Sequence, residues 1–283
     1  MPRRGVSDQR ILLTGASSGI GRALAVALAR RGARLLLTAR REKLLQSLAA
    51  ECRACGGAAE FAPGDVTDPA ARDAWIARAE QTWGGLDVLV NNAGVSAHGP
   101  FKESDEATLR QVMEVNFFAA VELTRLALPL LLSHTPRAGE SPPPAPGAHS
   151  RPSRPAIVNI GSIIGHRGLP LNSEYAASKF ALRGWTEALR AELSDQGVDV
   201  LLVSPGTTET EFFDHLLAKR AELPWGSATS ISAATVAEQT IRALERGRRE
   251  IFPNWRGRAL VVANRLAPGL VDRWLARMMR RAR

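Results

Sequence analysis

Cysteine, lysine and tyrosine are all scarce in this 283-residue sequence. Two cysteines are present, and only four of the 37 basic side chains belong to lysine. Cys52 and Cys55 form one C-x-x-C pair, whereas a structural metal site needs about four ligands. The pair closes a helical stretch rich in Arg, Leu and Ala, which is not the context of a thioredoxin-like redox motif. We therefore interpret both cysteines as incidental thiols and expect no metal site.

A long uncharged hydrophobic run is also missing. A membrane-spanning helix needs about 18 or more predominantly apolar residues. The best candidate, 117–132, is interrupted by Glu122, Arg125 and Pro129. Residues 1–10 are charged, and the apolar run that follows them ends after three residues, unlike a secretory signal. We expect a soluble, cytoplasmic protein.

The net charge of +9 raises the question of an anionic partner. Arginine supplies most of the basic side chains, and these are scattered over predicted helix faces until the last thirty residues. No zinc-finger spacing or other nucleic-acid-binding signature accompanies them. We interpret most of the arginines as solvated surface and expect no nucleic-acid partner.

Short apolar runs alternate with longer helical patterns along most of the chain. The apolar runs predict buried parallel strands at 10–13, 34–38, 86–90, 156–160 and 198–203. The longer patterns predict helices at 21–31, 41–52, 69–83, 105–132 and 173–196. Repeated units of this kind predict an α/β fold with a doubly wound parallel sheet and ligands at the carboxyl ends of its strands.

The segment 133–155 breaks this rhythm. It holds seven prolines among Ser, Gly, Arg and His, a composition that cannot bury an apolar face. We expect a disordered surface loop rather than a domain boundary, although an interaction loop would look the same. The chain then divides into one catalytic domain, 1–254, and a basic tail, 255–283.

The only tyrosine of the chain, Tyr175, precedes Lys179 by four residues. On a helix this spacing places both side chains on one face. An ammonium beside a phenol favours the phenolate, so we expect Lys179 to lower the pKa of Tyr175 from its usual value of about 10. A tyrosine tuned in this way can exchange a proton with a substrate. The alternative is an amphipathic helix on which the two residues are merely neighbours.

The first predicted strand runs into Thr14-Gly15-Ala16-Ser17-Ser18-Gly19-Ile20-Gly21 and then into an amphipathic helix. Glycines at these positions allow a tight turn, close approach of the backbone to a pyrophosphate, and close packing of helix on sheet. Because the motif lies inside a strand–helix unit, it predicts a dinucleotide site.

These motifs together resemble the short-chain dehydrogenase/reductase family. The G-x-x-x-G-x-G spacing is followed in order by Asn91-Asn92-Ala93-Gly94, then Ser162, Tyr175 and Lys179, and the resemblance covers about 10–213. It implies a single Rossmann-type sheet with a C-terminal substrate lobe. It also implies that the cofactor is held by Gly15, Ser17, Ser18, Gly19, Ile20, Gly21, Asn92, Ala93, Gly94, Tyr175, Lys179, Pro205 and Gly206.

The resemblance assigns a role to four catalytic residues. Tyr175 would protonate the carbonyl oxygen during reduction or accept the proton in the reverse direction, and Ser162 would hydrogen-bond the same oxygen. Lys179 would tune Tyr175 and hold the nicotinamide ribose. Asn116 would fix a water in the proton relay, although a helix-interior amide that only bonds backbone is compatible with the same sequence.

The choice of nicotinamide cofactor depends on the end of the second predicted strand. An NAD site usually has an acid there, whereas this chain has Arg40 and Arg41 and no acid before Glu42. Arg40, with help from Arg41, suits a 2′-phosphate, so we expect NADP(H) rather than NAD(H). The alternative for Arg40 is a solvent-facing arginine. Asp65 and Val66 resemble the family's adenine contacts, although Asp65 would also suit a turn before the next helix.

The segment 205–210 resembles the part of the family that lies beside the nicotinamide carboxamide. Thr208 and Thr210 are candidate contacts, although either would also suit the cap of a short helix. Residues 211–225 would then form a substrate-covering lobe. The lobe is apolar and so favours a hydrophobic substrate, although the same residues would serve packing: Phe212, Phe213, Leu216, Leu217 and Trp225.

The tail carries eight arginines and one acid, Asp272, between 255 and 283. Pro268 can begin an amphipathic helix with an arginine-rich face, a pattern that suits an anionic membrane surface. Docking on the core or on another subunit is the alternative. The apolar face would hold Leu270, Val271, Trp274, Leu275 and Met278, opposite Arg273, Arg277, Arg280 and Arg281.

The sequence thus predicts an NADP(H)-dependent reductase that acts on a ketone or aldehyde, or oxidises the matching alcohol. We expect the chain to form a homo-oligomer. The alternatives are a 3-oxoacyl-thioester reductase and a nucleotide-binding sensor or scaffold without catalysis. The full set of Asn116, Ser162, Tyr175 and Lys179 argues against a scaffold, which has no need of all four.

Overall fold

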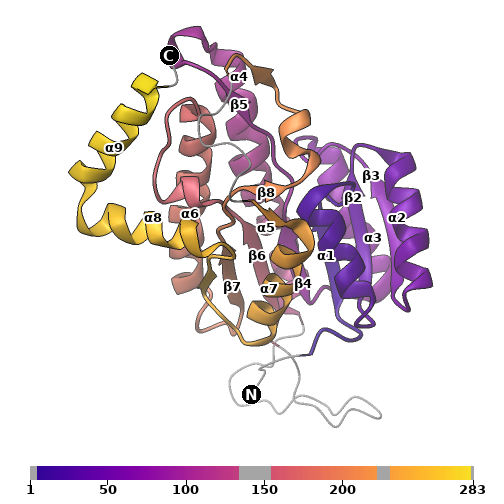
Figure 1. Ribbon diagram of the computed structural model, residues 1–283. Coiled ribbons are helices and arrows are strands. Elements are labelled where there is room, and N and C mark those ends of the chain that lie inside the picture. Colours follow the sequence, from indigo (N-terminus) through magenta and orange to yellow (C-terminus); the bar gives the residue numbers. More distant parts are fainter. Residues whose placement is uncertain (1–4, 134–153, 222–229, 282–283) are drawn as a thin grey trace.

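A seven-stranded parallel sheet forms the centre of the molecule in the computed structural model, which describes residues 5–133, 154–221 and 230–281 (Figure 1). The strand order is β11-β7-β6-β4-β1-β2-β3, and each neighbouring pair is parallel. The strands are β1 (Arg10–Thr14), β2 (Arg34–Ala39), β3 (Ala58–Pro63), β4 (Val88–Asn91), β6 (Ala156–Ile160), β7 (Asp199–Val203) and β11 (Glu250–Ile251).

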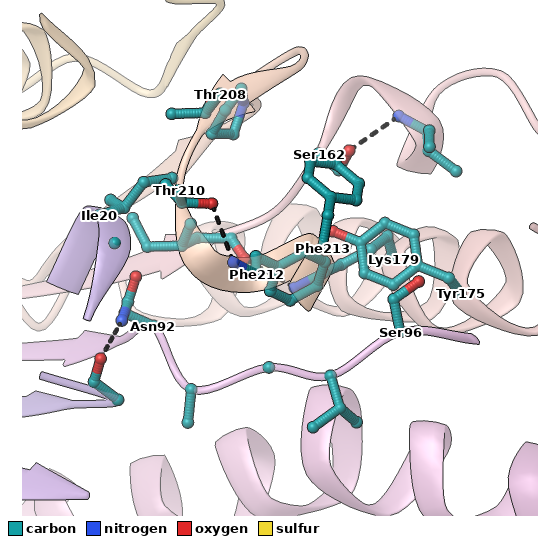
Figure 2. Close-up of a pocket in the computed structure, with 18 of the residues that line it drawn as sticks. Ile20, Asn92, Ser96, Ser162, Tyr175, Lys179, Thr208, Thr210, Phe212 and Phe213 are labelled. Atoms are coloured by element: carbon teal, nitrogen blue, oxygen red, sulfur yellow. Dashed lines mark hydrogen bonds between the residues drawn. The ribbon is translucent and has the colours of Figure 1, made fainter. Parts of the chain in front are cut away.

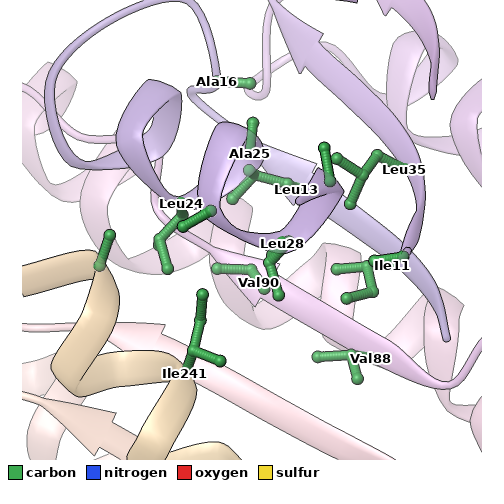
Figure 3. Close-up of a cluster of buried hydrophobic side chains, with 14 of the residues drawn as sticks. Ile11, Leu13, Ala16, Leu24, Ala25, Leu28, Leu35, Val88, Val90 and Ile241 are labelled. Carbon is green, nitrogen blue, oxygen red and sulfur yellow. The ribbon is translucent and has the colours of Figure 1, made fainter. Parts of the chain in front are cut away.

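Helices cover both faces of this sheet because its strands are apolar on both sides. In β1, Ile11 and Leu13 join one buried cluster and Leu12 joins the other. Figure 3 shows the first cluster, in which Leu24 and Leu28 of a helix pack on the sheet. The first face carries α1 (Gly19–Ala29), α2 (Glu42–Ala54) and α7 (Ala233–Glu245), and the second α3 (Pro69–Trp83), α5 (Ala119–Leu132) and α6 (Ser173–Glu192).

The sheet order places a binding crevice between β1 and β4. The chain leaves β1 towards β2 on one side, and later returns to β4 on the other side. Loops that follow the carboxyl ends of neighbouring strands diverge at such a switch point and leave room for a ligand. The loops that follow β1, β4, β6 and β7 carry most of the motifs predicted from sequence, and Arg40 and Asp65 follow β2 and β3.

The doubly wound sheet is confirmed, and the five predicted strands and five predicted helices are present. The strand 156–160 and the helix 69–83 have the predicted ends, and the other elements have shifted ends. The predicted helix 105–132 is interrupted: α4 (Glu106–Met113) passes through a π-helical segment, Glu114–Phe118, into α5. Of the sheet strands and the helices that cover them, the pattern missed β3, β11 and α7. Most of the expected loop 133–155 lies outside the described residues, as does Trp225.

One helical stretch, 106–132, is long and apolar enough to cross a membrane by length and composition. Its inner face is part of the protein core, because Leu123, Ala127 and Leu131 are fully buried against the sheet. Its outer face carries the Glu122–Arg125 ion pair. We therefore read this stretch as a core helix of the domain.

The C-terminal tail forms two helices, α8 (Trp255–Leu266) and α9 (Pro268–Arg281). Pro268 begins α9 as the sequence predicts. Val271 and Leu275 are buried, and Arg167 forms an ion pair with Asp272. The helix therefore docks on the rest of the chain, and the division of the chain at 254/255 stays a prediction.

Both cysteines are free thiols. Cys52 is buried in α2, and burial, more than the neighbouring Glu51, raises the pKa of its thiol to about 11. A thiol with so high a pKa is protonated at neutral pH and a poor nucleophile. This agrees with the interpretation of an incidental residue.

Candidate active site

The turn between β1 and α1 is built for close backbone approach. Gly15 and Gly19 have φ values of +62° and +54°, which favour glycine. A Cβ on Gly21 would lie 2.3 Å from the Gly15 carbonyl oxygen and 2.5 Å from Nδ2 of Asn92. A side chain at Gly21 would thus push the helix away from the turn, so the motif sets the position of the α1 N-terminus.

The segment after β4 is tied to this turn by a reciprocal set of hydrogen bonds. Asn92 donates from Nδ2 to the carbonyls of Thr14 (2.9 Å) and Gly15 (3.0 Å). In return, the Thr14 hydroxyl accepts from the backbone N–H groups of Asn92 (3.0 Å) and Ala93 (3.1 Å). The loops that follow β1 and β4 therefore form one hydrogen-bonded floor.

Ser162, Tyr175 and Lys179 come together from β6 and α6 (Figure 2). Ser162 follows β6 and caps a short 3₁₀ turn, where its hydroxyl accepts from the N–H of Ile164 at 3.2 Å. Nζ of Lys179 lies 5.6 Å from the Tyr175 ring centroid and donates to the Ile160 carbonyl at 2.9 Å. The helical spacing thus does bring the two residues to one site, beside the serine.

The expected direction of the Tyr175 pKa shift is wrong in this structure. Burial raises the pKa of Tyr175 to about 12, and a hydrogen bond with Ser162 offsets only part of that rise. Burial also lowers the pKa of Lys179 to about 8. Both shifts have the same origin, because a low-polarity site disfavours the phenolate and the ammonium alike. The buried surroundings thus outweigh the effect that we expected of the lysine on the tyrosine.

Asn116 lies in the π-helical segment and is fully buried. Its Oδ1 accepts from the Val95 N–H (2.8 Å), and its Nδ2 donates to the Val95 carbonyl and to Ser178 Oγ (both 2.9 Å). The Ser178 hydroxyl donates in turn to the Tyr175 carbonyl at 2.8 Å. The backbone-bonding role that the sequence left open is therefore present, and the relay role stays a prediction.

Arg41, rather than Arg40, is the arginine held at the glycine-rich turn. Its Nη2 donates to the hydroxyls of Ser18 (2.7 Å) and Ser17 (3.0 Å), and its Nη1 lies 3.8 Å from Glu211. Arg40 is exposed, although it too lines the cavity. We expected only a supporting part for Arg41, because spacing alone does not tell which of two adjacent arginines turns towards the loop.

Asp65 makes the turn that the sequence offered as its alternative role. Its Oδ1 accepts from the N–H (2.9 Å) and the hydroxyl (2.8 Å) of Thr67. Asp65 and Val66 nevertheless line the cavity, with Trp75 beside them. A Cβ on Gly64 would lie 3.0 Å from the Trp75 ring, so the indole sits directly against this loop.

The loop after β7 closes the cavity on the catalytic side. The Thr208 hydroxyl donates to the Gly206 carbonyl at 3.1 Å, and Thr210 caps the next 3₁₀ turn by accepting from the Phe212 N–H at 3.3 Å. The Phe212 ring lies 5.9 Å from the Tyr175 ring, centroid to centroid. The capping role of Thr210 is thus present, and both threonines line the cavity.

One cavity of about 1080 Å³ unites these parts. Every site residue predicted from sequence lines it except Gly21 and Asn116, which act behind its wall. Within the described residues, no group of three or more His, Cys, Asp or Glu side chains could hold a metal. The glycine-rich turn, with Ser17 and Ser18, and the two arginines after β2 fit a dinucleotide. The rest of the predicted lining consists of Asn92, Ala93, Gly94, Ser162, Tyr175, Lys179, Pro205, Gly206 and Thr208.

The far end of the cavity was only partly foreseen. Phe212, Phe213 and Leu216 line it as expected, whereas Leu217 does not. The sequence missed the contribution of α8 and α9, because nothing in a local pattern shows that a helix some hundred residues after Tyr175 returns to the site. The missed residues at this end include Ser96, His98, Leu169, Leu260, Trp274, Leu275 and Met278.

Comparison with known proteins decides the family. A family model described as short chain dehydrogenase matches residues 9–221. The chain belongs to the short-chain dehydrogenase/reductase family. It is therefore an NAD(P)-dependent oxidoreductase, and the resemblance drawn from the motifs over 10–213 is confirmed. A fold with a dinucleotide crevice at the β1–β4 switch point agrees with this membership.

Several relatives match most of the chain. The uncharacterized oxidoreductase YxnA of Bacillus subtilis is 32% identical over 277 residues, which are 97% of this chain and 73% of that protein. Dehydrogenase/reductase SDR family member 7B of Mus musculus is 30% identical over 282 residues, 96% and 82% of the two chains. Ketoacyl reductase HetN of Nostoc is 35% identical over 201 residues, 71% and 64%.

A solved structure of the family superposes closely. A short-chain dehydrogenase/reductase from Burkholderia phymatum, in complex with NAD, gives a TM-score of 0.80 at 25% identity and covers 94% of this chain and 96% of its own. An alcohol dehydrogenase from Thermococcus sibiricus gives a TM-score of 0.71 at 23% identity, over 86% and 95%. Both support the doubly wound fold.

Proposed function

We propose that this short-chain dehydrogenase transfers hydride between NADP(H) and a hydrophobic ketone or aldehyde, or the matching alcohol. The observation that carries the proposal is the shared cavity: the glycine-rich turn lines the same space as Ser162, Tyr175 and Lys179. A cofactor held by the turn and a carbonyl group held by the catalytic residues would therefore meet. When bound, the reduced nicotinamide supplies the hydride.

The chain itself supplies the proton and the charge stabilisation. A pKa of about 12 keeps the Tyr175 hydroxyl protonated at neutral pH, as a donor to the carbonyl oxygen requires. Ser162 shares a hydrogen bond with Tyr175 and can donate to the same oxygen as negative charge develops there. Lys179 lies behind the ring, where its ammonium stabilises the phenolate left after transfer.

The preference for NADP(H) is supported by the end of β2. Arg40 and Arg41 follow the strand and line the cavity, and the first acid, Glu42, begins α2. Arg41 already binds two hydroxyls of the turn, so its guanidinium is positioned to pair with a 2′-phosphate. Because Arg41, unlike Arg40, is held by hydrogen bonds to the turn, we assign both arginines an equal role in binding the 2′-phosphate.

Arg40→Asp tests the cofactor assignment. Loss of the guanidinium and gain of a carboxylate should weaken NADP(H) binding far more than NAD(H) binding, as measured by fluorescence titration with each. Arg110→Asp, an exposed change on α4 away from the cavity, is the matched control and should alter neither affinity. Equal loss of both cofactors in Arg40→Asp would overturn the 2′-phosphate assignment.

The apolar far end of the cavity supports a hydrophobic substrate. Phe212 and Phe213 face it from the lobe, and Leu260, Leu275 and Met278 face it from α8 and α9. Burial of a substrate chain against such a wall is favourable by about 25 cal/mol per Å² of apolar area. The similarity to a relative named ketoacyl reductase keeps a 3-oxoacyl thioester as the second candidate substrate.

A substrate screen tests the activity itself. Ketones, aldehydes, alcohols and 3-oxoacyl thioesters of increasing chain length are offered with NADPH and NADH, and the nicotinamide absorbance is followed. We expect reduction of long-chain carbonyl compounds with NADPH. Turnover of thioesters alone would select the second candidate, and no turnover of any carbonyl compound would refute the proposal.

Three further expectations from the sequence stay predictions. A homo-oligomer is supported by the exposed apolar side chains Leu109, Phe118 and Phe180 around α4 and α6. The cytoplasmic location and the absence of a nucleic-acid partner have no support beyond composition.

A further inference from the structure

We propose that the outer face of the α8–α9 pair docks on an anionic lipid bilayer. The sequence suggested a membrane role for the last helix alone, with all of its apolar side chains facing one way. The structure divides those side chains and adds a second helix to the surface. The docking surface is defined here as the exposed side chains of Trp255, Ala259, Val262, Leu266, Leu270 and Trp274 with the arginines beside them.

An apolar stripe runs along the solvent side of α8. Trp255, Val262 and Leu266 are 73%, 46% and 81% exposed, and together with Ala259 they recur at the spacing of one helix face. The opposite face carries Val261, which is buried, so α8 is apolar both towards the core and towards solvent. Packing within the chain therefore does not account for the outer stripe.

Exposed apolar side chains also lie on α9, beyond the turn at Pro268. Leu270 and Trp274, one helical turn apart, are 61% and 52% exposed, whereas Val271 and Leu275 are buried. The inner pair anchors α9 on the chain, and the outer pair extends the surface. Several large apolar side chains exposed on two consecutive helices indicate a binding surface.

The charge beside the stripe selects the occupant. Arg258, Arg265, Arg273, Arg277 and Arg280 are exposed on the same two helices. The one acid of the pair, Asp272, is already engaged by Arg167. Arg258 and Arg265 each directly precede a residue of the Trp255–Leu266 stripe, so on an α-helix they lie at its edge. Arg273 and Arg277 follow Leu270 by three and seven residues, so they lie on the same side of α9 as Leu270.

This arrangement favours an anionic bilayer over a second copy of the chain. A two-fold interface would place the same arginine-rich surface on both sides, and like charges brought together oppose association. A bilayer with acidic headgroups instead offers opposite charge at the level of the arginines and an apolar layer below it. Tryptophan at the boundary of that layer is characteristic of interfacial proteins.

The docking surface adjoins the mouth of the cavity. Trp274 is half-exposed and also lines the cavity, next to Leu275 and Met278. Figure 1 shows α8 and α9 at the edge of the molecule that lies away from α2 and α3. A substrate dissolved in the bilayer would therefore enter beside Trp274, a consequence that rests on the proposed function, whereas docking itself does not.

Vesicle co-sedimentation of the full chain tests the proposal. Vesicles of phosphatidylcholine alone are compared with vesicles that also contain phosphatidylserine, at low and at high salt. We expect at least tenfold stronger binding to the phosphatidylserine vesicles, and a clear loss of that binding at high salt, because salt screens exposed charges. Equal binding to both vesicle types, or no binding to either, would overturn the proposal.

Two double variants locate the contact. Leu266→Ser with Leu270→Ser removes apolar area, and Arg273→Glu with Arg277→Glu reverses charge; each should reduce vesicle binding at least tenfold. The matched controls are Phe101→Ser, which is 72% exposed on another part of the surface, and Arg110→Glu on α4. All six substituted positions are exposed, and circular dichroism melting checks that the four variants are folded.

The remaining outcomes separate docking from catalysis. If either double variant binds vesicles like the wild type, the surface is wrongly placed. If the wild type is a dimer by sedimentation velocity and the double variants are monomers that still bind vesicles, a second copy is the occupant. Reduction of a water-soluble carbonyl compound that the wild type turns over should be unchanged in the double variants. If the wild type reduces no carbonyl compound at all, the proposed function fails and the docking result still stands.

Discussion

Asn116 donates a hydrogen bond to the hydroxyl of Ser178 at 2.9 Å, and so ties the π-helical segment to the helix that carries Tyr175 and Lys179. The Ser178 hydroxyl donates in turn to the Tyr175 carbonyl. With both bonds to Val95, the Asn116 amide fixes three parts of the site relative to one another. A π-helical turn at this point, a feature often found at functional sites, turns the amide inward.

Asn116→Leu should therefore cost stability as well as activity. The change would leave the N–H and carbonyl of Val95 and the Ser178 hydroxyl without their partner in a buried place, and each such loss costs about 1–3 kcal/mol. We expect the free energy of unfolding, measured in urea, to fall by roughly 3 kcal/mol or more, and Ser178→Ala to lower it by only about 1 kcal/mol. Equal stability of Asn116→Leu and wild type would contradict the structural role.

Gly21→Ala should abolish cofactor binding. A methyl group there would lie 2.3 Å from the Gly15 carbonyl oxygen, and that backbone carbonyl cannot move without opening the turn. We expect at least a tenfold weaker affinity for the nicotinamide dinucleotide by calorimetry. Gly184→Ala on α6 is the matched control, because an added Cβ there meets nothing within 4 Å. That change should leave affinity unaltered and should stabilise the helix by roughly 0.5–1 kcal/mol. Full affinity in Gly21→Ala would contradict this role of the glycine-rich turn.

The lowered pKa of Lys179 should make the free energy of unfolding rise with pH. Burial lowers its pKa from 10.5 to about 8, so between these values the unfolded chain binds more protons than the folded one. The free energy of unfolding should then rise with pH, by about 1 kcal/mol between about pH 7 and 9. Lys179→Met should lack this rise in urea unfolding at the two pH values. The Cys52 thiol is present in both the wild type and Lys179→Met, so its effect on the pH dependence of stability cancels in the comparison. An equal rise in the free energy of unfolding with pH in both proteins would refute the lowered pKa of Lys179.

Local patterns were sufficient to predict the strands of the inner sheet and the residues that follow them. Leu12 and Leu13 lie in a continuous apolar run because β1 is covered on both sides, and Tyr175 and Lys179 share a face because a helix repeats every 3.6 residues. Such signals are local, and the parallel sheet gathers the strand ends at one edge. Most residues that line the cavity beside the glycine-rich turn could therefore be predicted from sequence, and their contacts with a cofactor stay a prediction.

What the sequence could not give depends on contacts between distant segments. The strand β3 carries Glu60 and Phe61 within a short mixed run, which has neither the length nor the alternation of a clear strand. The amphipathic pattern of α9 showed one apolar face, yet only packing decides that Val271 turns inward and Leu270 outward. The pKa of Tyr175 depends on how deeply the whole site is buried, which spacing to Lys179 does not reveal.

The central claim, that Tyr175 is the proton donor, is tested most directly by the turnover of Tyr175→Phe. The change keeps the ring and its packing against Phe212 and removes only the hydroxyl. With a carbonyl compound that the wild type reduces, we predict that kcat falls by a factor of about 10²–10⁴, the usual contribution of a general acid, while cofactor affinity falls far less than kcat. Carbonyl reduction by Tyr175→Phe at the wild-type rate would contradict the account.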